Sequence, residues 1–211
     1  MKVNKILVLV GIMSIASTAI SQEDDYREEL RFGIKAGGNF SNVYDSQSDD
    51  FEADGKLGFA GGVALSIPIG KYFGIQPELL LSQKGFKGRG SFLGSDYSFK
   101  RTTTYIDIPL QFQLKPSRYV TILVGPQYSY LIKQKDEFNS DFIDSSDEDE
   151  FENDNIRRNM LGIVAGLDVN IQKFVFGARM GWDFQNNHGD GSSNTPRYKN
   201  VWLQGTVGFY F

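Results

Sequence analysis

The sequence contains no cysteine among its 211 residues, which excludes a disulfide framework, a thiolate metal site and an acylated lipoprotein anchor. It has a single histidine, so a zinc or copper site would lack its usual ligands. Beyond the N-terminal stretch no apolar run reaches 18 residues, which excludes a bundle of transmembrane helices. The formal net charge of −4 has the wrong sign for a protein that neutralises phosphates, so we expect no nucleic-acid partner.

Aromatic residues and glycine, by contrast, are abundant. The chain has 17 Phe, 10 Tyr, 2 Trp and 23 Gly. This mixture favours strands and turns over helices. The length corresponds to one domain of ordinary size.

The N-terminus has the pattern of a secretory signal peptide. Lys2 and Lys5 precede an uncharged stretch over residues 6–22, and Ala19 and Ser21 satisfy the small-residue rule for cleavage. The stretch has only 17 residues, five of them Ser, Thr or Gln, which makes it a poor membrane-spanning anchor. We therefore expect a signal peptide over 1–21, a short periplasmic N-terminal segment over 22–30 and a further domain over 31–211.

The rest of the chain divides into eight segments in which apolar and polar residues alternate. In the last segment, Val201, Leu203 and Val207 fall on one face, whereas Gln204 and Thr206 fall on the other. This pattern is typical of strands with one apolar face and one polar face. The eight segments cover residues 31–42, 56–69, 72–86, 99–115, 118–132, 157–171, 174–186 and 199–211.

The connections between these segments alternate between short turns and long polar loops. Such alternation places all long loops at one rim of a barrel and all short turns at the other. Both ends of the mature chain then lie on the short-turn side. The short connections are 70–71, 116–117 and 172–173, and the long ones are 43–55, 87–98, 133–155 and 187–197.

Three features indicate that the apolar faces point outward into lipid. The segments have at least 12 residues, more than the roughly 9–11 that a tilted strand needs to cross a bilayer and well above the 5–6 or so of soluble strands. The opposite face carries many charges, listed below. Aromatic residues such as Tyr72, Tyr119 and Trp182 gather near the segment ends, as an interfacial girdle requires.

The sequence therefore predicts an all-β fold, an eight-stranded antiparallel up-and-down transmembrane β-barrel with short periplasmic turns and long extracellular loops. It would be a multi-pass protein of the cell outer membrane with both termini periplasmic. A soluble sandwich or lipocalin-like barrel is the alternative, because alternation alone does not distinguish inside from outside. Pro77, Pro109 and Pro126 lie inside segments, and we expect the strand ladder to break at bulges there.

Several runs of residues resemble those of the PorT-like small outer-membrane β-barrel family. Residues 105–109 match its Y-[LI]-[ED]-[IV]-P strand, and 32–37, 76–85 and 125–128 follow the expected order, so the resemblance covers about 30–211. It implies an eight-stranded barrel of the Gram-negative outer membrane. Some members are described as porins, and the namesake supports a protein-secretion system. The chain end, Phe209-x-Phe211, resembles the aromatic signal read by the barrel-assembly machinery, although Thr206 replaces its usual glycine.

Charged residues on the polar faces form the first candidate site. Eight strands leave an interior just wide enough for side chains to fill, and buried charges must pair to offset desolvation. We expect Arg179 to pair with Asp183, and Glu78 or Asp107 to pair with Lys35 or Lys84. A proton or ion pathway is the alternative interpretation. The expected lumen network comprises Lys35, Glu78, Lys84, Asp107, Asp168, Arg179 and Asp183.

An acidic loop over 134–156 is the second candidate. It carries ten carboxylates against Lys135 alone, a local charge of −10 + 1 = −9. The run Asp147, Glu148, Asp149 and Glu150 offers hard oxygen ligands to divalent cations, but it lacks the glycine and spacing of an EF-hand. The plainer interpretation is a solvated extracellular loop whose carboxylates repel one another. Docking of a basic partner is a third interpretation.

A catalytic site is the least supported interpretation. His188, Asp190 and Ser192 could form a Ser-His-acid set of the kind found in lipid-modifying barrels. However, they lie in a glycine-rich loop without a rigid strand to hold a nucleophile. We therefore expect no catalytic residue, no cofactor and no metal.

Together these features indicate a monomeric, non-enzymatic outer-membrane barrel with a lumen filled by side chains. It would act as a structural or interaction component. The family resemblance implies a further role, in which the barrel assists protein secretion. Its expected partners are outer-membrane lipid, the barrel-assembly machinery during insertion, and a protein that contacts the extracellular loops. A narrow channel or porin for small solutes is the first alternative, and a lipid-modifying outer-membrane enzyme is the second.

Overall fold

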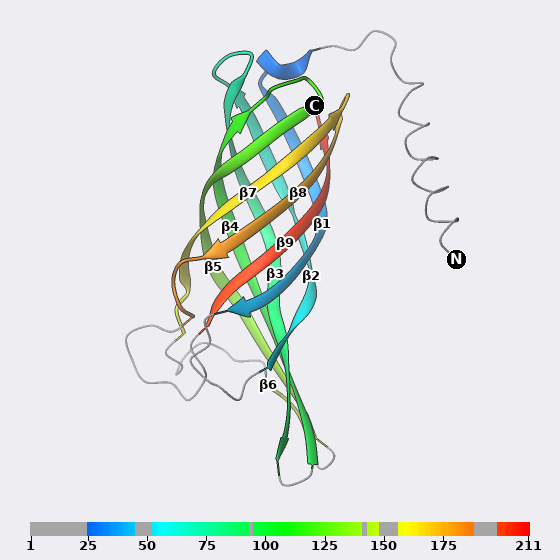
Figure 1. The fold of residues 1–211 in the computed structure, drawn as a ribbon, viewed down its shortest axis with the longest axis vertical. Coiled ribbons are helices and arrows are strands. Elements are labelled where there is room, and N and C mark those ends of the chain that lie inside the picture. Colours follow the sequence, from blue (N-terminus) through cyan, green and yellow to red (C-terminus); the bar gives the residue numbers. More distant parts are fainter. Residues whose placement is uncertain (1–24, 45–51, 93–94, 141–142, 148–155, 188–197) are drawn as a thin grey trace, which may run out of the picture.

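The computed structural model describes residues 25–44, 52–92, 95–140, 143–147, 156–187 and 198–211 (Figure 1). A short 3-10 helix, η1 (Tyr26–Glu28), precedes the first strand. Within the described residues, no helix is both long and apolar enough to cross a membrane. The strands are β1 (Arg31–Tyr44), β2 (Glu52–Pro68), β3 (Phe73–Phe92), β4 (Ser95–Leu114), β5 (Val120–Ser140), β6 (Ile143–Asp147), β7 (Asn159–Ile171), β8 (Phe174–Asp183) and β9 (Lys199–Tyr210).

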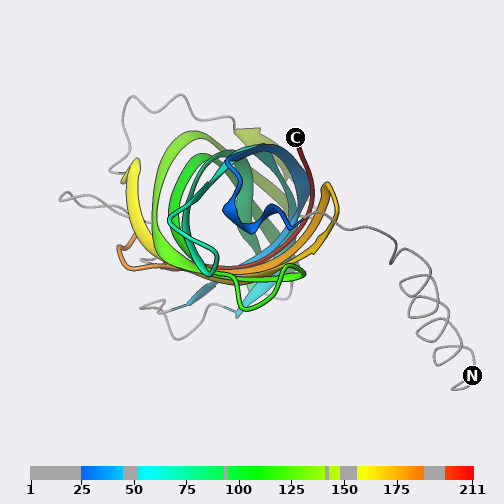
Figure 2. The ribbon, with the colours of Figure 1, turned by 90° about the horizontal axis from the view of Figure 1, so that it is seen from above.

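Eight of these strands close into an antiparallel barrel. The hydrogen-bonded order runs β4-β3-β2-β1-β9-β8-β7-β5, and β4 pairs with β5 to complete the ring seen in Figure 2. Except for the pair between the first strand, β1, and the last, β9, each pair joins ring strands that are consecutive along the chain. This is the up-and-down topology. The short strand β6 pairs with the end of β5 and stands outside the ring. The predicted fold class is confirmed.

Side-chain exposure alternates along each strand, with the apolar groups outside. In β1, Phe32 and Ile34 are 47% and 51% exposed, whereas Lys35 is 4% exposed. In β4, Leu110 and its apolar neighbours are exposed while Gln111 is fully buried. A water-soluble protein buries apolar side chains and exposes charged ones. The predicted outward direction of the apolar faces is therefore confirmed.

On the long-loop side, three strands continue well past their predicted ends and project from the ring (Figure 1). β3 ends at Phe92, β4 begins at Ser95 and β5 ends at Ser140. The expected loop over 87–98 and the start of the expected loop over 133–155 are therefore wrong. Cross-strand ion pairs stabilise the extension, because Lys100 lies 2.6 Å from Glu137 and Arg101 lies 2.6 Å from Asp136.

The strand ladder is interrupted beside the three prolines, as predicted, but its register shifts elsewhere. Its register shifts between Gly55 and Ala60 of β2, and between Thr104 and Tyr105 of β4. Paired positions are skipped beside Pro77, Pro109 and Pro126, but the register is the same on both sides of each gap, so the predicted breaks are confirmed and the predicted bulges are wrong. The physical reason is that a proline removes one ladder donor without adding a residue to the strand.

Candidate functional site

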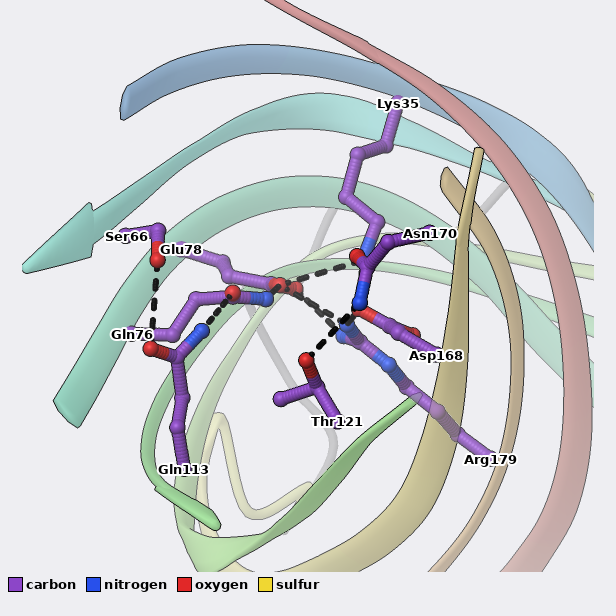
Figure 3. Close-up of polar contacts among 9 residues, drawn as sticks. All are labelled: Lys35, Ser66, Gln76, Glu78, Gln113, Thr121, Asp168, Asn170 and Arg179. Carbon is purple, nitrogen blue, oxygen red and sulfur yellow. Dashed lines mark hydrogen bonds and ion pairs between the residues drawn. The ribbon is translucent and has the colours of Figure 1, made fainter. Parts of the chain in front are cut away.

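Four charged side chains from four strands meet inside the barrel (Figure 3). Both terminal guanidinium nitrogens of Arg179 in β8 donate to Glu78 in β3, at 2.5 and 2.9 Å. The Lys35 ammonium of β1 donates to the same carboxylate at 3.3 Å. Asp168 of β7 lies 3.4 Å from Arg179 and 3.6 Å from Lys35. We call Lys35, Glu78, Asp168 and Arg179 the first ion cluster; its two cations and two anions balance.

Glycines opposite these residues give the cluster its space. Gly166 faces Arg179 across the β7–β8 ladder, and Gly177 faces Asp168. A Cβ at Gly166 would lie 2.5 Å from Cγ of Arg179, and one at Gly177 would lie 2.6 Å from Oδ1 of Asp168. A larger residue at either position would require these side chains to move, and at Gly166 also the backbone, because a Cβ there would lie 2.6 Å from the Ala178 carbonyl oxygen.

An amide chain extends the first ion cluster toward the short-turn rim (Figure 3). Nε2 of Gln76 donates to Glu78 at 2.5 Å, and Nε2 of Gln113 donates to the Gln76 carbonyl at 2.5 Å. The Ser66 hydroxyl then donates to Gln113 at 3.1 Å. Glu78 thus receives donors from four side-chain nitrogens, which offsets much of the cost of burying its charge.

A second group of contacts surrounds Lys84, whose side chain is completely buried. Its ammonium lies 3.2 Å from Asp107 and 3.4 Å from the Ser129 hydroxyl. It also lies 3.8 Å from the centroid of the Trp202 ring, a cation–π contact. Gly181 makes room for that ring, because a Cβ there would lie 2.1 Å from Cζ2 of Trp202.

The expected pair between Arg179 and Asp183 is wrong. Arg179 contacts Glu78 and Asp168 instead, and Asp183 accepts a hydrogen bond of 2.7 Å from Nδ2 of Asn200. Residues four positions apart on a strand share a face, but they lie roughly 13 Å apart along it. That spacing exceeds the reach of a direct ion pair, so the strand periodicity gave the right face and the wrong partner.

At the short-turn rim the lumen widens into a cavity of about 200 Å³, which we call the mouth cavity. Figure 2 shows η1 lying across part of this end of the ring. Nζ of Lys115 donates to the Arg27 carbonyl at 3.0 Å, and the Arg31 guanidinium lies 4.5 Å from the Tyr26 ring centroid. Hydrogen bonds from Arg27 lower the pKa of the Asp25 carboxyl to about 2.

A family model described as "Outer membrane protein beta-barrel domain" matches residues 20–189 of this sequence. The chain belongs to that family. The match spans most of the strands, and together with the outward apolar faces it places this barrel in an outer membrane. A search of curated proteins gives no match.

Solved structures of outer-membrane proteins are similar to this barrel at low sequence identity. Ail of Yersinia pestis is 18% identical, with a TM-score of 0.44 and coverage of 86% of this chain and 99% of its own. OprG of Pseudomonas aeruginosa is 12% identical, with a TM-score of 0.47 and coverage of 90% and 99%. The protease OmpT of Escherichia coli is 11% identical, with a TM-score of 0.40 and coverage of 90% and 99%.

All seven residues of the expected lumen network point into the ring, and each is at most 4% exposed. Sequence reasoning missed the neutral polar groups that link them, Gln76 and Gln113 above all, and the cations Arg31 and Lys115 at the mouth cavity. Their place in the sequence could have identified them, because all four residues lie on the polar, lumen-facing side of their segments close to the short-turn rim.

The remaining candidates fall largely outside the described residues. Asp147 ends β6, whereas Glu148, Asp149 and Glu150 of the acidic loop lie outside the described part of the chain, as does His188. Among the residues that the structure describes, no group of three or more potential metal ligands comes together.

Proposed function

We propose that this barrel is a non-catalytic outer-membrane component whose lumen is closed by its own side chains. It functions by binding partners at its two rims. The observation that carries the proposal is the first ion cluster. It ties β1, β3, β7 and β8 together across the interior with contacts of 2.5–3.6 Å. An ion crossing the barrel would have to separate these pairs, which costs several kcal/mol for each buried charge left alone.

The proposed orientation places the short turns and both termini in the periplasm and the long loops outside the cell. It follows the general arrangement of bacterial outer-membrane barrels. In this orientation residues 1–21 are a signal peptide and 22–30 a periplasmic segment. The projecting parts of β3, β4 and β5, which include the first residues of the acidic loop, then present a partner surface outside the cell.

The PorT-like resemblance of residues 105–109 and the other runs favours one finer role, support of protein secretion across the outer membrane. In this role the monomeric barrel contacts lipid and the barrel-assembly machinery during insertion and a protein partner afterwards. Affinity purification in mild detergent, with the projecting strands intact or with the Arg101–Asp136 pair removed, tests for that partner. A partner retained equally by both forms would contradict the proposed surface.

Conductance in planar bilayers tests the closed lumen. Wild-type protein is expected to show no steady open pore. Arg179→Ala removes the two guanidinium hydrogen bonds to Glu78 and is expected to conduct intermittently. Lys173→Ala is the control, because that side chain lies at the rim outside the first ion cluster. A steady open pore in the wild type would replace this proposal with a narrow channel for small solutes.

A further inference from the structure

The mouth cavity is a built compartment with contributions from around the ring. Its floor includes Gln76, Gln113 and Asp168 of the lumen, shown in Figure 3, and its roof includes Tyr26 of η1. Its volume of about 200 Å³ far exceeds the roughly 10–15 Å³ of such volume that a single water molecule needs. The compartment therefore fits a compact ligand or the end of a larger one.

The charge around this cavity is strongly positive. Five cationic side chains line it, Arg27, Arg31, Lys115, Arg118 and Lys173, against the single carboxylate of Asp168. Asp168 is already matched by the cations of the first ion cluster, and Arg27 is paired with Asp25 at 2.6 Å. Within the described residues, neither Arg31 nor Lys115 has a carboxylate at ion-pair distance, although both are less than 9% exposed.

A buried donor points to the same ligand chemistry. Tyr210 lines the cavity and is 2% exposed, and its hydroxyl has no hydrogen-bond partner among the described residues. Burial together with the nearby Arg31 and Arg27 lowers the pKa of Lys115, and Asp25 opposes this shift only in part. A buried polar group without a partner is costly, so a ligand that supplies an acceptor would be stabilised here.

We propose that the mouth cavity binds a compact oxyanion, a carboxylate or phosphate group, held by Arg31 and Lys115 and by the Tyr210 hydroxyl. The guanidinium fork suits such a group, and the ammonium adds a point charge beside it. The tyrosine rings of the cavity give the body of the ligand apolar contact. This assignment goes beyond the closed-lumen proposal and does not depend on it.

Isothermal titration of the purified full-length barrel with inorganic phosphate, in a zwitterionic detergent and a phosphate-free buffer, tests the site. Saturable binding of one phosphate is expected. Arg31→Gln and Lys115→Gln should each weaken it about tenfold or more, because each removes a charged hydrogen-bond donor. Tyr210→Phe should also weaken it several-fold, and it keeps the ring that Arg31 contacts.

Lys71→Gln is the matched control, because Lys71 lies in a short turn at the same rim but does not line the cavity. It removes one positive charge and should leave phosphate binding unchanged. Heat-modifiable migration of each variant in SDS gels verifies that the barrel is folded. Absence of saturable binding, or equal weakening by Lys71→Gln and Lys115→Gln, would overturn the assignment.

Two sources could supply the oxyanion, a soluble periplasmic solute or the headgroup of an anionic phospholipid at the rim. Repeating the titration in nanodiscs with and without phosphatidylglycerol distinguishes them. Phosphate binding that is weakened by phosphatidylglycerol identifies the headgroup as the occupant. Binding that is unaffected identifies a soluble anion; both results support the site.

Discussion

Arg179 is the side chain on which the interior depends most. It makes the shortest contacts of the first ion cluster, donating to Glu78 at 2.5 and 2.9 Å, and it also lies 3.4 Å from Asp168. Arg179→Ala would leave the single ammonium of Lys35 to balance two buried carboxylates. We expect a loss of about 3–5 kcal/mol in the free energy of unfolding.

Urea unfolding in detergent, followed by tryptophan fluorescence, measures this loss. Lys173→Ala is the control, because that exposed side chain takes no part in the first ion cluster, and it should change the free energy of unfolding by less than about 0.5 kcal/mol. Equal midpoints for the two variants would show that the cluster does not stabilise the barrel.

A substitution at Gly181 tests the second group of contacts, those around the Lys84 ammonium. In Gly181→Ala the new methyl would lie 2.1 Å from the Trp202 ring, so the indole must move away from the Lys84 ammonium. We expect a destabilisation of about 1–3 kcal/mol and a shift in tryptophan emission. Gly205→Ala is the matched control, because a Cβ there meets nothing within 4 Å; a similar cost for both substitutions would contradict the steric explanation.

At the scale of the strands, two ion pairs on neighbouring rungs of the projecting β4–β5 ladder should differ in strength. Lys100 and Glu137 are substantially exposed, whereas the Arg101 side chain is 6% exposed and makes two hydrogen bonds to Asp136. We expect Lys100→Ala to cost less than about 1 kcal/mol and Arg101→Ala to cost roughly 1.5–3 kcal/mol. Hydrogen exchange of residues in the projecting part of β5 measures both effects.

The strands also show which features of the fold the sequence pattern predicts and which it does not. Alternating polarity is a local, period-two signal, so it predicted the eight strands of the ring and their lumen faces, including that of Glu78. It did not predict that Glu78 would meet Arg179, 101 positions away, because that contact depends on strand tilt and stagger around a closed barrel. It also missed the end of β5, where residues such as Gln134 and Lys135 are polar on both faces.

The lipid-facing surface is a property of the whole molecule, and Leu110 tests it. This side chain is 51% exposed on a strand buried on its other face. Leu110→Lys should cost roughly 2–4 kcal/mol, whereas a lysine near the interface costs about 0–1 kcal/mol. Leu30→Lys, just before β1 at the short-turn rim, is the matched control; equal, small costs measured by unfolding in lipid vesicles would contradict burial of Leu110 in the bilayer.

Closure of the ring makes a prediction for the entire chain. Because β4 pairs with β5, from Tyr97 with Ser140 to Leu114 with Ile122, the sheet formed by the eight strands has no open edge within the ring. Detergent cannot replace these backbone hydrogen bonds strand by strand, so the barrel should resist SDS until it is boiled. We expect the unheated protein to migrate differently from the boiled protein in SDS gels. Identical migration of the two samples would contradict a closed, detergent-resistant barrel, and boiling followed by refolding into detergent should restore the original band.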